Sequence, residues 1–181
     1  QGNLIEDSHS QMLQKFSLTG FDDQGKTFWK LEGDTAKIEP GETVFLESNV
    51  TLRLRDYTVV KTDNVQWSQD GKLLKTNAPV HVTHENLRID GRGALGRPDQ
   101  SFIQINRDIE MDVNATTHLS CDGPMKVFYK ENKMIFYRNV KITDERGTLT
   151  ARKMDVYFNS AEKKINQIIA IGQVVIKRGT D

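Results

Sequence analysis

The stretch Arg138–Phe158, RNVKITDERGTLTARKMDVYF, repeats in outline a stretch that begins 90 residues earlier, Ser48–Trp67, SNVTLRLRDYTVVKTDNVQW. In both, apolar residues alternate with polar ones, which is the period of a β-strand with one buried face. In the later copy the alternation is interrupted by Asp144-Glu145-Arg146-Gly147, a typical turn sequence. These stretches predict short β-strands separated by tight turns.

The similarity of these two stretches is part of a shorter repeat. One five-residue pattern occurs five times, at spacings of 30, 29, 31 and 34 residues. It consists of a polar residue, Val or Ile, one further residue, an aliphatic residue and a polar residue. A unit of this kind cannot bury its own apolar face, so neighbouring units must stack into one continuous apolar strip. The copies are Asn49–Arg53, Pro79–Thr83, Asp108–Asp112, Asn139–Thr143 and Gln173–Lys177.

The whole chain from Phe16 onward has this alternating character, so we predict an all-β fold. Stacked units whose apolar faces meet would form two facing antiparallel sheets, an elongated sandwich or β-jelly roll. Residues 1–15 are predicted to be an N-terminal tail or a short helix, because Ile5, Met12, Leu13 and Phe16 share one helical face. We expect free strand edges near Phe16–Thr19 and Val174–Arg178.

Aromatic residues recur at one place in the repeat: Trp67, Tyr129 and Phe158. Ordinary core packing and the lining of a groove both demand apolar residues on the same strand face. The sequence leaves these two interpretations open.

Composition excludes several classes of partner and bond. Lys plus Arg and Asp plus Glu each total 25, so no net field attracts nucleic acid or an anionic membrane. Cys121 is the single cysteine, which rules out an internal disulfide. No apolar run is long enough to cross a bilayer. The chain starts with Gln1 rather than Met, so we expect that an upstream segment, such as an anchor, has been removed.

The sequence also lacks the motifs of common enzymes. His81 and His84 lie three apart in a predicted strand and should point to opposite faces, so no metal site is expected. No phosphate-binding loop or nucleophile motif occurs, and we expect neither an enzyme nor a cofactor. A carbohydrate-active jelly roll using surface carboxylates remains an alternative; the candidates are Asp22, Asp23, Asp34, Asp63 and Asp70.

The C-terminal part resembles the OstA-like domain of LptA, a lipopolysaccharide transport protein of Gram-negative bacteria. The likeness runs from Met125 to Gly179 and includes the Arg-Asn-Val phrase at Arg138–Val140, Leu149-Thr150-Ala151, and the Ile-x-x-Ile-x-Ala-x-Gly-x-Val phrase that starts at Ile165.

The earlier part resembles LptC, the inner-membrane-anchored member of the same transport system. FWKLEGDTAKI at Phe28–Ile38, NVQWSQDGKLLKTNAPVHV at Asn64–Val82 and NLRIDGRGAL at Asn86–Leu95 carry this likeness. The predicted organisation is an LptC-like half at 16–113 and an OstA-like half at 114–181 that continues the same sheets.

The resemblance implies a periplasmic protein that holds the acyl chains of lipopolysaccharide in an apolar crease between two sheets opened like a V. It implies docking with related jelly rolls through edge strands, possible homo-oligomers, and an inner-membrane anchor upstream of Gln1. Whether the protein is the anchored component, the bridge or a fusion stays open, and a structural or adhesive β-repeat protein with a dry core is the main alternative. The candidate groove residues are Val50, Leu52, Val65, Trp67, Val80, Val82, Ile109, Met111, Val127, Val140, Ile142, Val156, Phe158, Val174 and Ile176.

Overall fold

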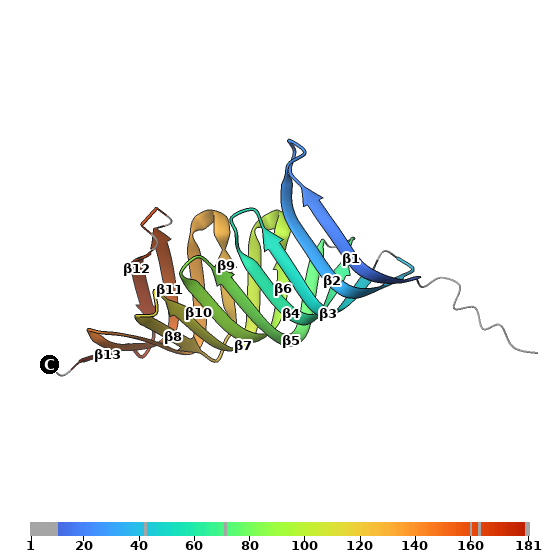
Figure 1. The fold of residues 1–181 in the computed structure, drawn as a ribbon. Helices are drawn as coiled ribbons and strands as arrows, with labels where there is room; N and C mark the ends of the chain where they lie inside the picture. Colours follow the sequence, from blue (N-terminus) through green and yellow to red (C-terminus); the bar gives the residue numbers. More distant parts are fainter. Residues whose placement is uncertain (1–10, 42, 71, 160, 163, 180–181) are drawn as a thin grey trace, which may run out of the picture.

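The computed structural model describes residues 11–41, 43–70, 72–159, 161–162 and 164–179, and these residues form an elongated, twisted stack of strands (Figure 1). They contain no α-helix, only the two short 3₁₀ turns η1 (Pro98–Gln100) and η2 (Tyr129–Glu131). The all-β prediction is therefore confirmed. The strands are β1 (Gln11–Phe21), β2 (Thr27–Glu39), β3 (Thr43–Leu54), β4 (Val59–Ser68), β5 (Leu73–His84), β6 (Leu87–Arg97), β7 (Phe102–Val113), β8 (Thr117–Cys121), β9 (Met125–Phe128), β10 (Lys133–Asp144), β11 (Gly147–Asn159), β12 (Lys164–Ile171) and β13 (Val175–Arg178).

The strands form one antiparallel sheet in which neighbours in sequence are neighbours in space. The order is β1-β2-β3-β4-β5-β6-β7-β8-β10-β11-β12, with β9 pairing with β7 and β10, and β13 pairing with β11. β8 and β9 act as two halves of one long strand, because both lie between β7 and β10. β12 and β13 are related in the same way, each pairing with a different half of β11.

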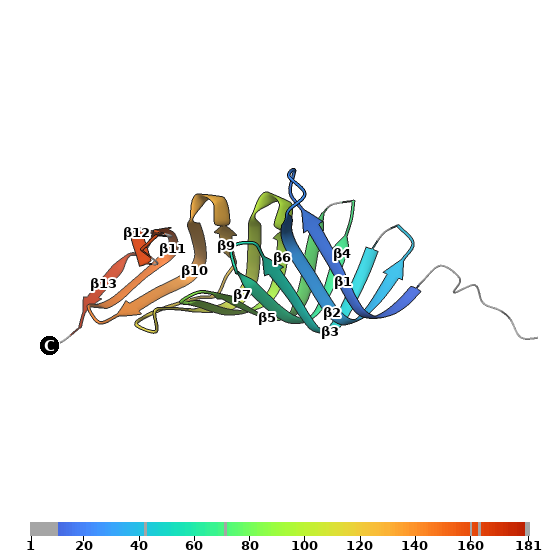
Figure 2. The ribbon, with the colours of Figure 1, turned by 45° about the horizontal axis from the view of Figure 1, so that its top comes forward.

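Each long strand is bent near its middle. The pairing register shifts between Glu47 and Val50 in β3, between Thr76 and Pro79 in β5, and between Tyr137 and Val140 in β10. Extra residues of this kind form β-bulges, which bend a strand and increase its twist. Because the shifts lie side by side, they fold the sheet along one line, which we call the corner, into two walls (Figure 2).

The walls are defined by the pairing on either side of the corner. Wall A contains 11–14, 35–39, 43–47, 65–68, 73–76, 94–97, 102–105, 125–128, 133–137, 153–159 and 164–171. Wall B contains 16–21, 27–32, 50–54, 59–62, 80–84, 87–90, 109–113, 117–121, 140–144, 147–151 and 175–178.

The sequence repeat marks this corner. Asn49, Asp108, Asn139 and Gln173 have φ values of 52°, 55°, 51° and 51°, a left-handed conformation in which Asn and Asp are several-fold enriched. The aliphatic residue after Asn49, Asp108 and Asn139 starts the next strand segment in wall B, whereas Val174, after Gln173, directly precedes β13. The repeat of about 30 residues is thus the length of two long strands, because the chain crosses the corner once in each strand.

Side-chain hydrogen bonds reinforce two equivalent corners. Asn49 Nδ2 donates to Asp34 Oδ2 at 2.5 Å, and Asn139 Nδ2 donates to Asp122 Oδ2 at 2.5 Å. Gly123 makes the turn between β8 and β9 with a φ of 99°, where a Cβ atom would lie 2.4 Å from the Asn106 carbonyl oxygen. A side chain at this position would therefore clash with backbone.

The core lies between the walls as two adjoining clusters. One cluster extends from Trp29 to Leu74 and the other from Val80 to Val156, and Leu54 and Val60 pack against both. β7 pairs with β8 across the proposed 113/114 boundary, and Met111 and Leu119 share one cluster. The sheet and the core thus pass through this boundary without interruption.

The predicted N-terminal helix is wrong for residues 11–15. Met12, Leu13 and Phe16 lie in β1. Lys15, with a φ of 53°, lies at the corner, and β1 pairs with β2 on both sides of it. Pairing with β2 supplies hydrogen bonds along the backbone, which overrides a weak helical periodicity. Ile5 lies outside the described residues. β1 is the edge strand at one end, and β12 and β13 form the other end, as expected.

Candidate functional site

Three adjoining hollows lie between the walls. Their volumes are about 110, 440 and 40 Å³, and Ile103 lines all three. The first and second share Asp56 and Tyr129, while the second and third share Leu52 and Gly96. We call this connected space the groove. Its largest part falls within the 300–1,000 Å³ range of small-molecule sites.

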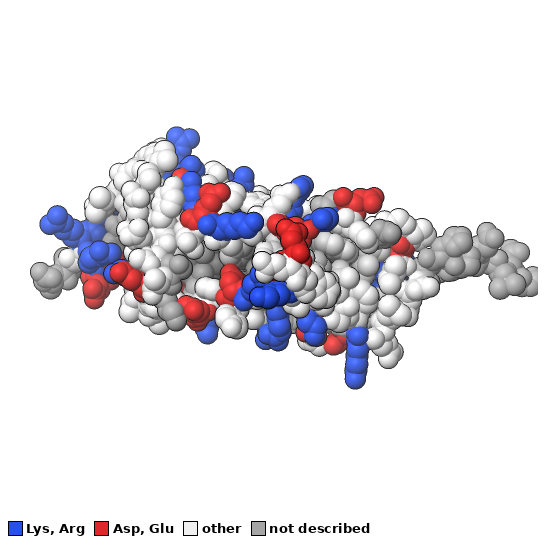
Figure 3. Space-filling model, turned by 90° about the horizontal axis from the view of Figure 1, so that it is seen from above, with Lys and Arg blue, Asp and Glu red and all other residues white. Residues whose placement is uncertain are grey.

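The groove runs from the corner to the rims. Its deep part is lined by aliphatic residues such as Val50, Val80 and Leu74, and its outer part by turns of both walls. Figure 3 views the molecule from above, where acidic and basic residues lie among uncharged ones on the face shown. An apolar interior with charges confined to its mouth suits an alkyl chain and disfavours an ionic ligand in depth.

Fewer than half of the predicted groove residues line this space. The seven that do are Val50, Leu52, Val65, Val80, Val82, Val127 and Phe158. Five others are buried in the core and line none of the three hollows: Trp67, Ile109, Met111, Val140 and Val156. Trp67 packs against Trp29 with ring centroids 5.4 Å apart.

The three remaining predicted residues lie at the C-terminal end. Ile142 and Ile176 line a separate hollow of about 170 Å³. Ile176 and Val174 are 71% and 46% exposed, because the last segment pairs with β11 on one side only. Packed core that includes Phe136 and Met154 lies between this hollow and the groove.

The mouth of the groove contains polar residues, and Asp56, Thr58 and His84 among them were not predicted to line it. Thr58 of wall B is fully buried, and its hydroxyl shares a hydrogen bond of 3.0 Å with Nδ1 of His84. The Thr58 backbone N–H donates to Asp56 Oδ1 at 3.1 Å. Tyr129 approaches from wall A, where burial, with a smaller effect from Asp56, raises the pKa of its phenol well above the ordinary value. Asp56 and Thr58 come from the turn between β3 and β4, which carries no alternation that could reveal them, whereas Tyr129 is one of the recurring aromatic residues of the repeat.

A tryptophan bridge bounds the groove toward β1. Trp29 Nε1 of wall B donates to Asp99 Oδ1 of η1, on the rim of wall A, at 3.4 Å. Lys72 forms an ion pair of 3.3 Å with the other Asp99 oxygen. A Cβ atom on Gly20 would overlap the Trp29 ring at 2.2 Å, so this glycine leaves room for the indole. The two rims are therefore tied together at this point.

Two of the five candidate carboxylates of a carbohydrase, Asp22 and Asp34, are engaged in structural contacts. Arg55 donates to Asp22 at 2.5 Å, and this bond, helped by backbone N–H groups, lowers the pKa of Asp22. Asp34 accepts the corner hydrogen bond from Asn49. A glycosidase acid needs a raised pKa, so Asp22 does not fit that role.

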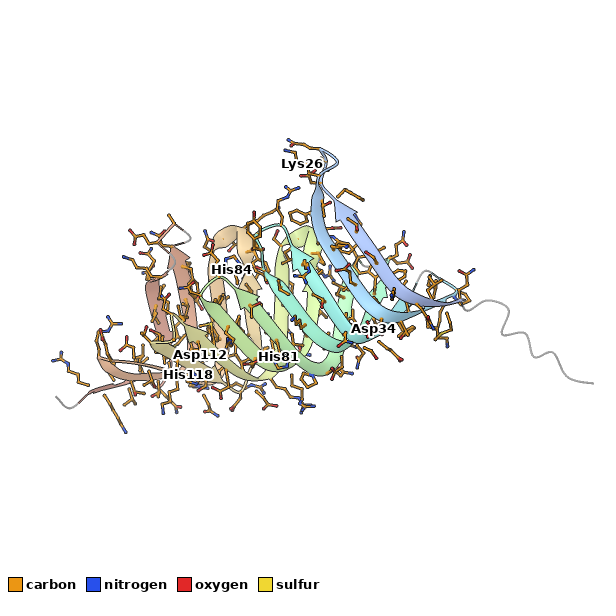
Figure 4. The ribbon with its side chains drawn as sticks, in the orientation of Figure 1. Lys26, Asp34, His81, His84, Asp112 and His118 are labelled. Atoms are coloured by element: carbon orange, nitrogen blue, oxygen red, sulfur yellow. The ribbon has the colours of Figure 1, made fainter. Side chains whose placement is uncertain are left out.

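His81 and His84 have different surroundings, as predicted from strand alternation (Figure 4). His81 is exposed and contacts Asp90, whereas His84 lines the groove. His118 contacts Asp112 at 2.8 Å and Glu110 at 2.6 Å; the Asp112 hydrogen bond is the main cause of its raised pKa. In the described part of the chain, no group of His, Cys, Asp and Glu side chains is arranged to hold a metal ion.

Cys121 is a small buried residue of the core. It is buried opposite Ile109, and burial raises the pKa of its thiol to about 11. A thiol in this environment stays protonated and unreactive near neutral pH.

Comparison with known proteins agrees with the LptC resemblance of the earlier part of the chain. A family described as "Lipopolysaccharide-assembly, LptC-related" matches residues 3–111. The OstA-like character of residues 114–181 stays a prediction, since the match ends before them. No curated protein matches the chain significantly. Among the described residues, no helix has the length and apolarity needed to cross a membrane. Because the family match covers more than half of the sequence, the chain belongs to the LptC-related family of lipopolysaccharide-assembly proteins.

Proposed function

We propose that this protein carries lipopolysaccharide through the periplasm, with the acyl chains held in the groove between walls A and B. The observation that carries the proposal is the connected apolar space that opens at the rims, where Asp56, Thr58 and Tyr129 lie. Family membership supplies the lipid class, since the family acts in lipopolysaccharide assembly. The sugars and phosphates would remain in water outside the mouth.

The energetics favour a groove over a closed pocket. Burial of one methylene stabilises by about 0.8 kcal/mol, so a chain of a dozen carbons gains on the order of 10 kcal/mol. A lipid this tightly held in a closed cavity would leave slowly. In a groove, a moving lipid gives up apolar contacts and gains similar ones further along. The protein therefore needs to supply only a path and no catalysis.

Passage along the whole molecule requires the walls to separate locally. The described conformation has packed core around Phe136, Met154 and Val156 between the groove and the C-terminal hollow. These contacts are apolar on both sides, so an acyl chain that enters replaces apolar contacts by apolar contacts. The groove would then extend to the exposed residues at β12 and β13.

Docking to related jelly rolls would occur through the two ends. Among the described strands, β1 pairs only with β2 and β13 only with β11, so each presents an edge that can add a strand. Several apolar side chains are exposed at the C-terminal end: Ile169, Ile171, Val174, Val175 and Ile176. A second jelly roll that pairs there would cover these side chains and continue the apolar path. An inner-membrane anchor upstream of the described residues is part of the same proposal.

Site-specific photo-crosslinking in living cells tests the proposal. A benzoylphenylalanine in place of Phe158 or Leu54, which line the groove, should crosslink to lipopolysaccharide. Phe45 and Tyr137 occupy outward positions of β3 and β10 and are matched controls that should give no adduct. Adducts at the controls alone, or at none of the four positions in folded protein, would favour the structural β-repeat with a dry core.

The docking part is tested separately at Ile176. A benzoylphenylalanine there should crosslink to another jelly-roll protein of lipopolysaccharide assembly or to a second copy of this chain. The same group at exposed Lys61, in the middle of the stack, should not. An adduct pattern that is the same at both positions would contradict docking through the C-terminal edge.

A further inference from the structure

The groove ends before it reaches β1, although apolar surface continues to that strand. None of the residues of β1, all of which the structure describes, lines any of the three hollows. The inner side of β1 is nevertheless apolar, because Phe16 and Leu18 pack against the same core cluster as Trp29. Something therefore separates the groove from the edge at which docking is proposed.

Trp29 lies at this separation. In wall B it pairs with Gly20 of β1 on one side and, on the other, with Leu54 of β3, which lines the second hollow. Trp29 is only 5% exposed, and its indole N–H donates to Asp99 on the rim of wall A at 3.4 Å. The tryptophan bridge thus stands between the largest hollow and β1.

The donor and the acceptor of the bridge are each held by their own wall. The indole rests over Gly20, where a Cβ atom would lie 2.2 Å from Trp29 Nε1. Asp99 is held within wall A by Lys72, whose Nζ lies 3.3 Å from the other carboxylate oxygen. Across the walls, the indole also contacts the Trp67 ring, with ring centroids 5.4 Å apart. Separation of the rims therefore breaks one hydrogen bond and one ring contact and leaves both partners in place.

The hydrogen bond of the bridge is suited to reversible opening. Its length of 3.4 Å exceeds the usual range of about 2.7–3.2 Å for an N–H···O bond. The Asp99 side chain is 41% exposed, so water can replace the indole as its partner when the bond breaks. The strand pairing runs within each wall and around the corner, so the rims can separate while the pairing stays intact.

We propose that the hydrogen bond between Trp29 and Asp99 is a gate that controls the passage of acyl chains between the groove and the β1 end. In the described conformation the gate is closed, because the indole lies between the two. When the rims separate, an acyl chain reaches Phe16 and Leu18 and, past them, the edge of the sheet. This inference rests on the proposed function, because it assigns a point of control to the same groove.

Hydrogen exchange of the Trp29 indole N–H measures opening of the gate without any lipid. The chain has two tryptophans and hence two indole N–H signals in an NMR spectrum, which Trp67→Phe assigns. Asp99→Ala removes the acceptor, and loss of one hydrogen bond of ordinary strength should raise the open population, and with it the exchange rate, about fivefold. Gln100→Ala is the matched control: Gln100 is exposed in the same turn, and its loss should leave the rate unchanged.

Photo-crosslinking to added lipopolysaccharide measures passage through the gate. A benzoylphenylalanine replaces either Phe16, beyond the bridge in β1, or Phe158, which lines the first hollow. The ratio of the adduct yield at Phe16 to that at Phe158 reports how often the lipid passes the bridge. Asp99→Ala should raise this ratio about fivefold, in step with the open population, and Gln100→Ala should not change it.

The outcomes distinguish the gate from the groove. If Phe158 gives an adduct but Asp99→Ala changes neither the exchange rate nor the adduct ratio, or changes only one of them, the gate is refuted while the groove stands. Equal effects of Asp99→Ala and Gln100→Ala also refute the gate, because the turn rather than the hydrogen bond would then be responsible. If Phe158 gives no adduct in folded protein, the lipid groove itself is refuted, whatever the exchange rate shows.

Discussion

The geometry of the corner predicts how substitutions of Asn139 change the free energy of unfolding. This residue combines a left-handed backbone, with a φ of 51°, and a hydrogen bond of 2.5 Å to Asp122. Asn139→Ala loses the hydrogen bond, worth about 1 kcal/mol at an exposed site, and adds about 1 kcal/mol of backbone strain. The expected loss in the free energy of unfolding is about 2 kcal/mol, from the sum of these two effects.

Asn139→Gly separates the two contributions. Glycine adopts the left-handed region without steric cost, so this variant should lose only about 1 kcal/mol. In an Asp122→Ala background the hydrogen bond is already absent, and Asn139→Ala should then add only the strain, about 1 kcal/mol. Urea unfolding followed by circular dichroism measures all of these differences.

Lys141→Ala is the control, because Lys141 is exposed on the same strand; its change should stay within about 0.5 kcal/mol. If alanine at position 139 proved as stable as glycine, the corner would not depend on the left-handed conformation. If the Asp122→Ala background left the effect of Asn139→Ala unchanged, the hydrogen bond would contribute nothing.

Three further predictions concern the core, a close approach and a titrating surface residue. Phe136→Ala should cost about 3–5 kcal/mol in urea unfolding, because Phe136 is fully buried; a loss below 1 kcal/mol would contradict its packing. Gly91→Ala should cost about 1–3 kcal/mol, since the added Cβ would lie 2.3 Å from Ile105 Cγ2, whereas Gly96→Ala, with 3.8 Å to its nearest neighbour, should be nearly neutral; equal effects would refute this. The raised pKa of His118 means that its contribution to stability is fully present below the ordinary value of 6.5 and is lost as pH rises through the raised pKa. Asp112→Asn should therefore lower the His118 pKa measured by NMR, and an unchanged pKa would show that the Asp112 hydrogen bond is not its main cause.

The strands could be predicted from the sequence because alternation is a direct consequence of one buried face. The bend could not, since a strand that bends at a bulge keeps the same alternation on both sides. The signal was nevertheless present: Asn49, Asp108 and Asn139 precede the aliphatic pair in three copies of the repeat, and short polar residues mark left-handed backbone.

The groove was only partly predictable, because lining a hollow and filling a core require the same residue types. Val80 and Val140 occupy equivalent places just after a corner, yet Val80 lines a hollow and Val140 is packed. The difference depends on which side chains approach from the opposite wall. Phe136 and Met154 fill the space between the walls in their part of the cluster that extends from Val80 to Val156. The mouth residues Asp56 and Thr58 lie in a turn and carry no periodic signal.

The central claim is that acyl chains lie between the two walls, and methyl NMR with a spin-labelled lipid tests it most directly. A nitroxide on the acyl chain should broaden the methyl signals of Val82, Ile103 and Val127, which line the groove. The signals of Ile135 and Ile169, on the outer side of wall A, should remain sharp. Broadening at Ile135 and Ile169 with sharp signals at the three groove residues would contradict the account.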